Sequence, residues 1–223
     1  VTNEKSTFES IPVAINGWED LTGSLHLFSI VDLLLLFSVF QGFLLIVAIP
    51  TIQTNNREAN KWLLASLGIS SVMLLLYTFG NYQEIANRFP KILLLSDFIL
   101  FIYGPLYYFY LVKLLFKNSG FPSRWYWHFL AFGVQLIVYL PFLFKDDTNL
   151  LEDLMNQDWP LVSLFTANGF FGLIWNIYYW RLFKKTVQSY QLAFQTNFSD
   201  DQNLNYLQAV SWIQLVTIIL WSF

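Results

Sequence analysis

The chain has 223 residues, of which 56% are hydrophobic and only 12% are charged, and its formal net charge is −3. Soluble domains are about half apolar and about a quarter charged, and one soluble core could not hide so much apolar surface from water. The composition excludes a soluble domain and predicts an integral membrane protein, and the small net charge gives no electrostatic reason to expect nucleic-acid binding.

A polar external tail at residues 1–26 precedes six apolar stretches in a transmembrane region at residues 27–223. Each stretch is close to the ~20 residues that cross a hydrocarbon core as a helix, and a helix satisfies its backbone polar groups internally. The predicted spans are about 27–49, 60–80, 92–116, 126–144, 161–183 and 206–223. We therefore expect an all-α fold, a polytopic transmembrane helix bundle.

The basic residues predict the orientation, because Lys and Arg collect on the cytoplasmic side. They are more numerous after the first, third and fifth spans, which places the N-terminus outside. Six spans would then end the chain outside, so we expect a seventh span, missing from this chain, to follow in the native protein. The cytoplasmic set is Arg57, Lys61, Lys113, Lys117, Arg124, Arg181, Lys184 and Lys185, and the external set is Lys5, Arg88, Lys91 and Lys145.

Two segments between the spans have features of their own. From Lys145 to Pro160, apolar residues spaced among acids predict a short amphipathic helix on the outer surface. From about Lys184 to Asn205 we expect the largest cytoplasmic loop, with a helix start at Ser199 shortly before the sixth span.

Two acids, Asp32 and Asp97, lie within predicted spans. A charged group at membrane depth is costly unless it is paired or hydrated, which makes both acids candidates for function. At ~1.5 Å per residue, both lie roughly 8–10 Å below the outer surface. The functional interpretation is a ligand-binding pocket open to the outside. The alternative is that each carboxyl reaches the headgroups, or stays protonated and bonds to a neighbouring helix.

Gly104 and Pro105 lie inside the third span and predict a bend there, because proline lacks a backbone donor and clashes with the preceding turn. Tyr103 and Tyr107 flank this bend. We add both tyrosines to the candidate ligand-binding residues and regard Gly104 and Pro105 as a candidate hinge. The alternative is a kink that serves packing alone.

Other polar, small and aromatic residues in the spans have structural interpretations. Amides join membrane helices by hydrogen bonds and small residues allow close contact, whereas Trp and Tyr anchor span ends at the headgroups. The amides are Gln41, Gln135, Asn168 and Asn176; the small residues are Ser66, Gly68, Ser70 and Ser71; the anchors are Trp62, Trp125, Trp127, Trp159, Trp180, Trp221, Tyr77, Tyr82 and Tyr139.

The sequence carries no catalytic or cofactor signature. It has no cysteine, and its two histidines, His26 and His128, lie far apart. It contains no nucleophile elbow, zinc-binding helix motif or phosphate-binding glycine loop. We therefore expect neither an enzyme, nor a metal centre, nor a bound cofactor. A transporter built from paired broken helices is also disfavoured, since only the third span is interrupted.

Five segments, in order, resemble the N-terminal membrane region of membrane-bound AraC-type transcriptional regulators, a group common in Bacteroidetes. They are Leu33 to Leu45 (LLLLFSVFQGFLL), Ala59 to Leu67 (ANKWLLASL), Tyr103 to Leu115 (YGPLYYFYLVKLL), Trp127 to Leu143 (WHFLAFGVQLIVYLPFL) and Phe198 to Val216 (FSDDQNLNYLQAVSWIQLV). The resemblance implies a seven-span sensor followed by a cytoplasmic helix-turn-helix domain. The chain departs from that pattern in its added external tail and in lacking the seventh span and the DNA-binding domain.

From this resemblance we expect a signal-sensing module in the inner membrane of a bacterium. Its partners would be membrane lipids and a ligand or protein on the outer side, with no nucleic-acid contact through this chain. The alternative is a structural or accessory subunit of a larger membrane complex, which would use the external tail and the acidic outer loop to bind its partner.

Overall fold

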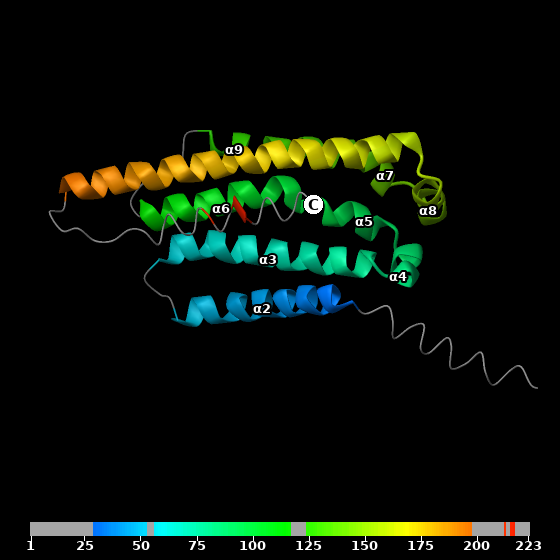
Figure 1. Ribbon diagram of the computed structural model, residues 1–223, viewed down its shortest axis with the longest axis horizontal. Coiled ribbons are helices and arrows are strands. Elements are labelled where there is room, and N and C mark those ends of the chain that lie inside the picture. Colours follow the sequence, from blue (N-terminus) through cyan, green and yellow to red (C-terminus); the bar gives the residue numbers. More distant parts are fainter. Residues whose placement is uncertain (1–28, 53–55, 117–123, 198–211, 213–214, 217–223) are drawn as a thin grey trace, which may run out of the picture.

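The computed structural model describes residues 29–52, 56–116, 124–197, 212 and 215–216, and every regular element in those ranges is a helix (Figure 1). The helices are α2 (Ile30–Ile52), α3 (Arg57–Gly80), α4 (Gln83–Arg88), α5 (Lys91–Ser96), α6 (Ile99–Leu115), the 3₁₀-helix η1 (Trp125–Phe129), α7 (Leu130–Leu143), α8 (Asp147–Met155) and α9 (Trp159–Asn197). The expectation of an all-α fold is therefore confirmed for the described residues.

Five helical segments of the described residues are long and apolar enough to cross a membrane. They are Ile30–Ile52, Arg57–Gly80, Lys91–Leu115, Trp125–Leu143 and Trp159–Leu192. They overlap the first five predicted spans and indicate a multi-pass membrane protein. The predicted sixth span lies outside the described residues, except for Trp212, Leu215 and Val216.

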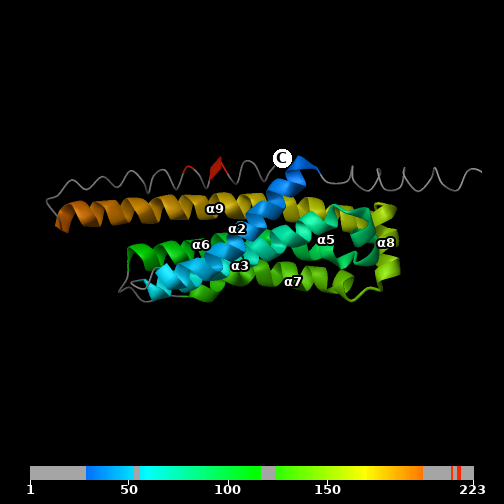
Figure 2. The same cartoon turned by 90° about the horizontal axis from the view of Figure 1, so that it is seen from below.

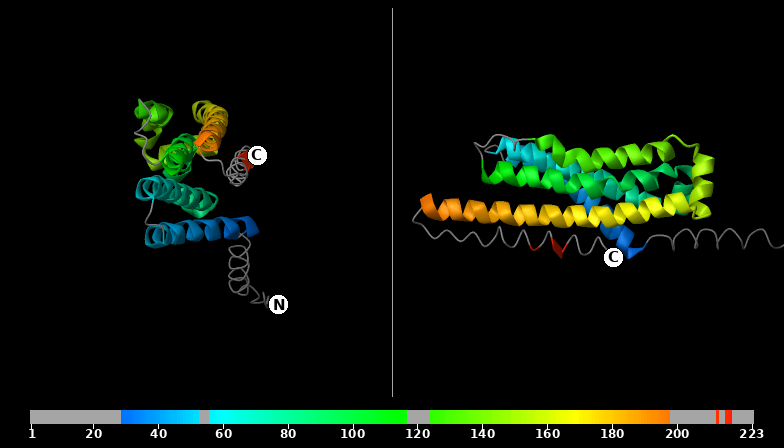
Figure 3. Two further views of the ribbon diagram at one scale, coloured as in Figure 1. Left: turned by 90° about the vertical axis from the view of Figure 1, so that its left-hand side faces the viewer. Right: turned by 90° about the horizontal axis from the view of Figure 1, so that it is seen from above.

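Helix α6 occupies the centre of the bundle. The helix packs against α3 and α9, while α2 packs against α3 and lies at the edge. Seen end-on, α6 lies between α3 and α9, with α7 beside it (Figure 3). Half of the apolar stretch of the third span is buried inside the bundle, compared with 11–17% of the corresponding stretches of the other four spans. Polar groups in the third span therefore have neighbours on several sides.

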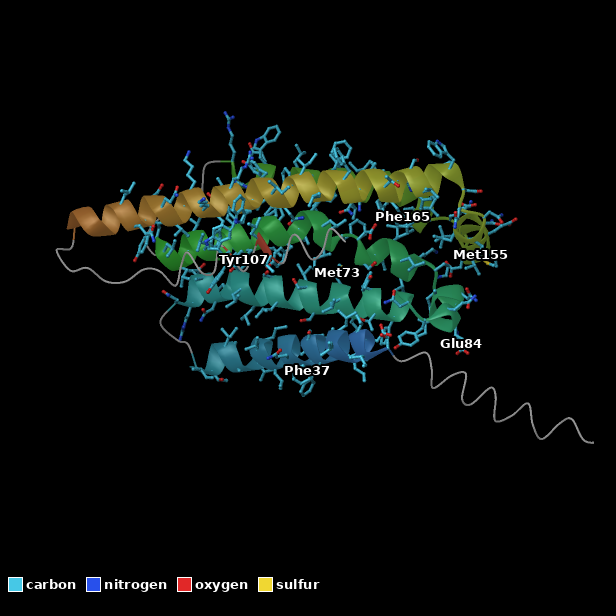
Figure 4. All side chains as sticks on the ribbon, viewed as in Figure 1. Phe37, Met73, Glu84, Tyr107, Met155 and Phe165 are labelled. Carbon is cyan, nitrogen blue, oxygen red and sulfur yellow. The ribbon has the colours of Figure 1, made fainter. Side chains whose placement is uncertain are left out.

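The outer surfaces of the spans are apolar, as contact with lipid requires. Side chains along α2 such as Leu34, Phe37 and Phe40 are exposed, and Phe37 points away from the other helices (Figure 4). An apolar surface of this extent is unfavourable in water and favourable among acyl chains. The edge helix α2 therefore presents most of its side chains to the bilayer.

Small residues allow α2 and α3 to approach closely. Ser71 is buried, and a Cβ atom at Gly42 would collide with its Oγ atom. A Cβ at Gly68 would touch Ile46 Cδ1 at 3.7 Å. The prediction that small residues in the second span mark a close helix contact is therefore confirmed, and its partner is the first span.

A short helix, α8, crosses one end of the bundle at a steep angle to the spans (Figure 2). Leu150 of α8 is fully buried against a core that includes Leu94 and Leu161. Ion pairs join Lys91 to Asp147 at 2.9 Å and Lys145 to Asp153. The predicted amphipathic helix is present, and its apolar residue Leu150 packs onto the spans.

Helix α9 is much longer than the predicted fifth span. It continues without a break through the segment after Lys184, where we predicted a loop, and ends at Asn197. Its 39 residues measure about 58 Å at 1.5 Å each, nearly twice the ~30 Å hydrocarbon thickness. The loop prediction is wrong for this part, and α9 extends beyond the ends of α2, α3 and α6 (Figures 1 and 2).

Candidate functional site

The third span is interrupted at Asp97 and Phe98, between the end of α5 and the start of α6. Two hydrogen bonds between residues three positions apart bridge the turn. Phe98 N donates to Leu95 O at 3.3 Å, and Leu100 N donates to Asp97 O at 3.1 Å. The predicted hinge residues Gly104 and Pro105 instead lie within the continuous helix α6. The interruption therefore falls at the acid and not at the proline.

Three side chains from two other spans donate hydrogen bonds to Asp97. The Tyr139 hydroxyl donates to Asp97 Oδ2 at 2.8 Å, and Asn168 Nδ2 donates to the same oxygen at 3.3 Å. Gln135 Nε2 donates to the Asp97 carbonyl oxygen at 3.1 Å. Asp97, Gln135, Tyr139 and Asn168 thus connect the third span to α7 and α9. We refer to these four residues as the Asp97 junction.

The Asp97 junction lies in an apolar environment. Tyr139 is fully buried, and only 4% of the Gln135 surface is exposed. The Phe98 and Tyr139 rings lie 5.4 Å apart, and Tyr139 belongs to the same core as Leu150 of α8. In the part of the chain that the structure describes, no Lys or Arg forms an ion pair with Asp97. Gln135 Oε1 is buried there without a hydrogen-bond partner.

Asp32 has different partners. Its Oδ2 accepts a hydrogen bond from Ser29 N at 3.1 Å, while Ser29 Oγ accepts one from Val31 N at 3.2 Å. This reciprocal pair is a variant of the capping box at the start of α2, in which Ser29 accepts from the second helical residue. Burial and the nearby Asp32 carboxylate raise the pKa of Tyr82 above its ordinary value. Asp32 therefore caps a helix near the turn that follows α3, apart from the contacts of Asp97.

Pro105 has a consequence one turn earlier. Without a backbone N–H, it cannot donate to the carbonyl of Phe101, and Trp175 Nε1 of α9 donates to that oxygen at 3.1 Å. Asn176 Nδ2 donates to the neighbouring Leu100 O at 2.9 Å. Side chains from a neighbouring helix thus satisfy the carbonyls around the proline. The predicted role of Asn176 in joining helices is confirmed.

The two candidate tyrosines of α6 contact each other, and Tyr107 also contacts α9. The rings of Tyr103 and Tyr107 stack with 5.8 Å between centroids, and Tyr107 stacks on Phe183 at 5.6 Å. Tyr103 and Tyr107 follow Asp97 by roughly 9 and 15 Å along the helix axis. Gly104 lies against Tyr179, whose ring atoms a Cβ would meet at 2.8 Å. Gly104 and Tyr107 therefore pack against α9, separately from the Asp97 junction.

Tyr139 does not lie at the headgroup level where the sequence predicted it. We predicted a headgroup anchor, whereas Tyr139 is fully buried and bonds to Asp97. The signal that could have found it is spacing, because Tyr139 follows Gln135 by four residues and shares its helix face. Gln135 and Asn168, predicted to join helices, do so at Asp97, whereas Gln41 is exposed on α2.

The geometry is that of a half-buried carboxyl that joins three spans at a break in the central one. Polar groups of this kind in a membrane interior are commonly functional, since their burial is costly. No family model matches the chain, and no curated protein or solved structure matches it.

Proposed function

We propose that this chain is the signal-sensing membrane module of a membrane-bound transcriptional regulator in the inner membrane of a bacterium. One observation carries the proposal: α9 passes the Asp97 junction at Asn168 and continues as a single helix to Asn197. A rigid element that joins a polar junction inside the membrane to a segment beyond the spans can carry a change from one to the other.

The contacts of α9 support transmission along its length. Near the junction, Asn168, Trp175 and Asn176 donate hydrogen bonds to the third span. Further along, Phe183 and Val187 form a buried core with Leu111 of α6. A signal acts only if it binds one arrangement of these helices better than another. Two such arrangements would differ in the hydrogen bonds at the Asp97 junction.

The external contact of the module would lie at α8 and the N-terminal tail, with the N-terminus outside. Helix α8 is coupled to the junction through packing, since Leu150 and Tyr139 belong to one buried core. A ligand or protein that displaces α8 would therefore disturb the residue that bonds Asp97. DNA would be bound by a further domain of the regulator, as the resemblance of the segments from Leu33 to Val216 implies.

The test uses the complete native gene in its bacterial host. With Asp97→Asn on the chromosome, the proposal predicts a reproducible change in the abundance of a defined set of transcripts, measured by RNA sequencing. The matched control is Glu84→Gln, which alters an exposed acid of α4. Unchanged transcripts in the Asp97→Asn strain, with the protein present at its normal level, would contradict the sensor.

The alternative is a structural or accessory subunit of a larger membrane complex. The exposed apolar side chains of the edge helix α2 favour it, because they offer a face for another membrane protein. The native reading frame separates the two functions. A helix-turn-helix domain encoded after a seventh span favours the regulator, whereas a nearby stop codon and purification in a stable complex favour the subunit.

A further inference from the structure

The Asp97 junction contains one carboxyl oxygen and one amide oxygen that receive no hydrogen bond from the described residues. Both side-chain donors, Tyr139 and Asn168, bond to Asp97 Oδ2, and Gln135 Oε1 has no partner. We propose that the junction binds a proton, carried on Asp97 Oδ1 and donated in a hydrogen bond to Gln135 Oε1. This inference names the ligand of the proposed sensor and to that extent rests on the proposed function.

The hydrogen-bonding capacity of the groups carries the argument. An ionised carboxylate only accepts, whereas a protonated carboxyl also has one O–H to donate. Gln135 holds its amide beside Asp97 through the bond from Nε2 to the backbone carbonyl, at 3.1 Å. The other end of that amide is a buried acceptor without a donor. One proton on Asp97 would give the carboxyl an O–H that can donate, and Gln135 Oε1 would then have a hydrogen-bond partner.

The two bonds to Oδ2 are compatible with either charge state, because the carbonyl oxygen of a neutral carboxyl still accepts. Proton binding forms one O–H bond on Oδ1, with the proton taken from external water and returned to it. The positions of Tyr139 and Asn168 therefore need not change for the proton to bind. What changes is the bond to Gln135 and the net charge inside the span.

Among the residues that the structure describes, the groups around Asp97 supply no compensating positive charge. From α7 comes Tyr139, from α9 the uncharged Asn168, and from α8 and α3 the apolar Leu150 and Met73 of the adjoining core. The nearest basic residue on α5 is Lys91, six positions earlier, and its ammonium pairs with Asp147 of α8. A carboxylate without a cation is unfavourable at this depth, and a proton removes the charge.

Infrared difference spectroscopy tests the inference on the full chain in lipid nanodiscs. Spectra at acidic and alkaline pH should differ by the C=O stretches of all carboxyls that become protonated, and Asp97→Asn should remove one component of this difference, the Asp97 band. Glu84→Gln, at an exposed position of α4, is the matched control and should leave the band in place. Persistence of the band in an Asp97→Asn protein of normal helix content would overturn the proposal.

Two further variants retain the carboxyl and so remain informative if Asp97→Asn fails to fold. Gln135→Leu removes the acceptor of the proton, which should move the midpoint of the titration to lower pH. Tyr139→Phe removes a donor that favours the ionised form, which should move the midpoint to higher pH. Each shift should correspond to a roughly tenfold change in proton affinity. Identical midpoints in all three proteins would contradict the assignment.

Exchange of sodium chloride for choline chloride at constant pH tests whether a metal cation competes for the junction. The same band in both salts supports the proton as the ligand, whereas loss of the band with sodium alone would overturn the proton as the sole ligand. The two proposals also fail separately. If the band titrates as expected but transcripts do not respond to Asp97→Asn, proton binding is supported and the sensor proposal is contradicted. If transcripts respond to Asp97→Asn but no band titrates, proton binding is contradicted and the sensor proposal still stands.

Discussion

Pro105 creates a requirement at Phe101, whose carbonyl oxygen has no donor within its own helix. In lipid there is no water to satisfy that oxygen, so a neighbouring helix must do so. Trp175 of α9 supplies the hydrogen at 3.1 Å. A single indole therefore allows a proline in the most buried span, and it joins α6 to α9 at the same point.

Replacing Trp175 with Phe should lower the free energy of unfolding by about 1–3 kcal/mol, the usual cost of an unsatisfied buried acceptor. Pro105→Ala restores the helical donor to Phe101 O, so the double variant should lose less than the sum of the two single losses. Denaturant unfolding in mixed detergent micelles measures all four proteins. Strict additivity would show that the hydrogen bond contributes nothing.

Gly104 serves close packing. A Cβ atom there would meet Tyr179 Cγ and Cδ2 at 2.8 Å, and that ring is almost fully buried. Gly104→Ala should therefore cost about 2 kcal/mol, typical of overpacking, as measured by the same unfolding assay. The controls are Gly133→Ala and Gly169→Ala, since a Cβ at either site meets nothing within 4 Å. Equal stabilities for all three variants would refute this role.

The residue types of the junction could be predicted from the sequence, but their pairing could not. Asp97, Gln135 and Asn168 are conspicuous because polar side chains are rare within apolar spans. Which of them meet depends on the rotation of each helix about its axis, and an apolar run of the kind in α7 fixes no such rotation. The role of Tyr139 was even harder to predict, because tyrosine is equally suited to a headgroup anchor.

At the scale of elements, α8 is held by its burial more than by its ion pairs. Leu150 is 0% exposed, whereas Met155 at the C-terminal end of the helix is 70% exposed. Exposed ion pairs such as Lys91–Asp147 contribute at most about 1 kcal/mol each. The attachment of α8 to the spans is therefore mainly apolar, through the fully buried Leu150 and the partly buried Leu154.

Leu150→Ala should lower the free energy of unfolding by about 2–5 kcal/mol, as expected for truncation of a fully buried leucine. Met155→Ala, the control on the same helix, should change it by less than about 0.5 kcal/mol. Hydrogen exchange of the α8 amides gives a second measurement, since a detached α8 exchanges faster. A Leu150→Ala protein with unchanged exchange and stability would show that α8 is anchored elsewhere.

The interruption of the third span shows what sequence reveals about an element. Pro105 is the obvious helix breaker, yet α6 continues through it because Trp175 and Asn176 compensate from another helix. The break at Asp97 and Phe98 has no proline or glycine to mark it. It is compatible with the membrane because Gln135 bonds the carbonyl of Asp97. In both cases tertiary contacts decide, and no local propensity records them.

At the scale of the molecule, the positions of the first five spans were predictable because hydropathy is a property of sequence alone. The length of α9 was not, since Lys184 and Lys185 mark the end of an apolar stretch and not the end of a helix. Helix continues there because Phe183, Val187 and Tyr190 still pack against the end of α6.

The predicted orientation has a direct test, because the chain contains no cysteine. Asn149→Cys on α8 and Ser189→Cys on α9 each introduce one exposed thiol. If the N-terminus is outside, a membrane-impermeant maleimide should label position 149 in intact cells. The same reagent should label position 189 only after the membrane is permeabilised. The reverse pattern would invert the topology.

The length of α9 has a mechanical consequence. The helix axis measures about 43 Å from Asn168 to Asn197, so a tilt of roughly 5° about the junction displaces the far end by roughly 4 Å. That displacement is comparable to the diameter of a methyl group. An angular change too small to disrupt the packing near the pivot thus becomes, at the other end of the lever arm, a movement that can open a contact or close one.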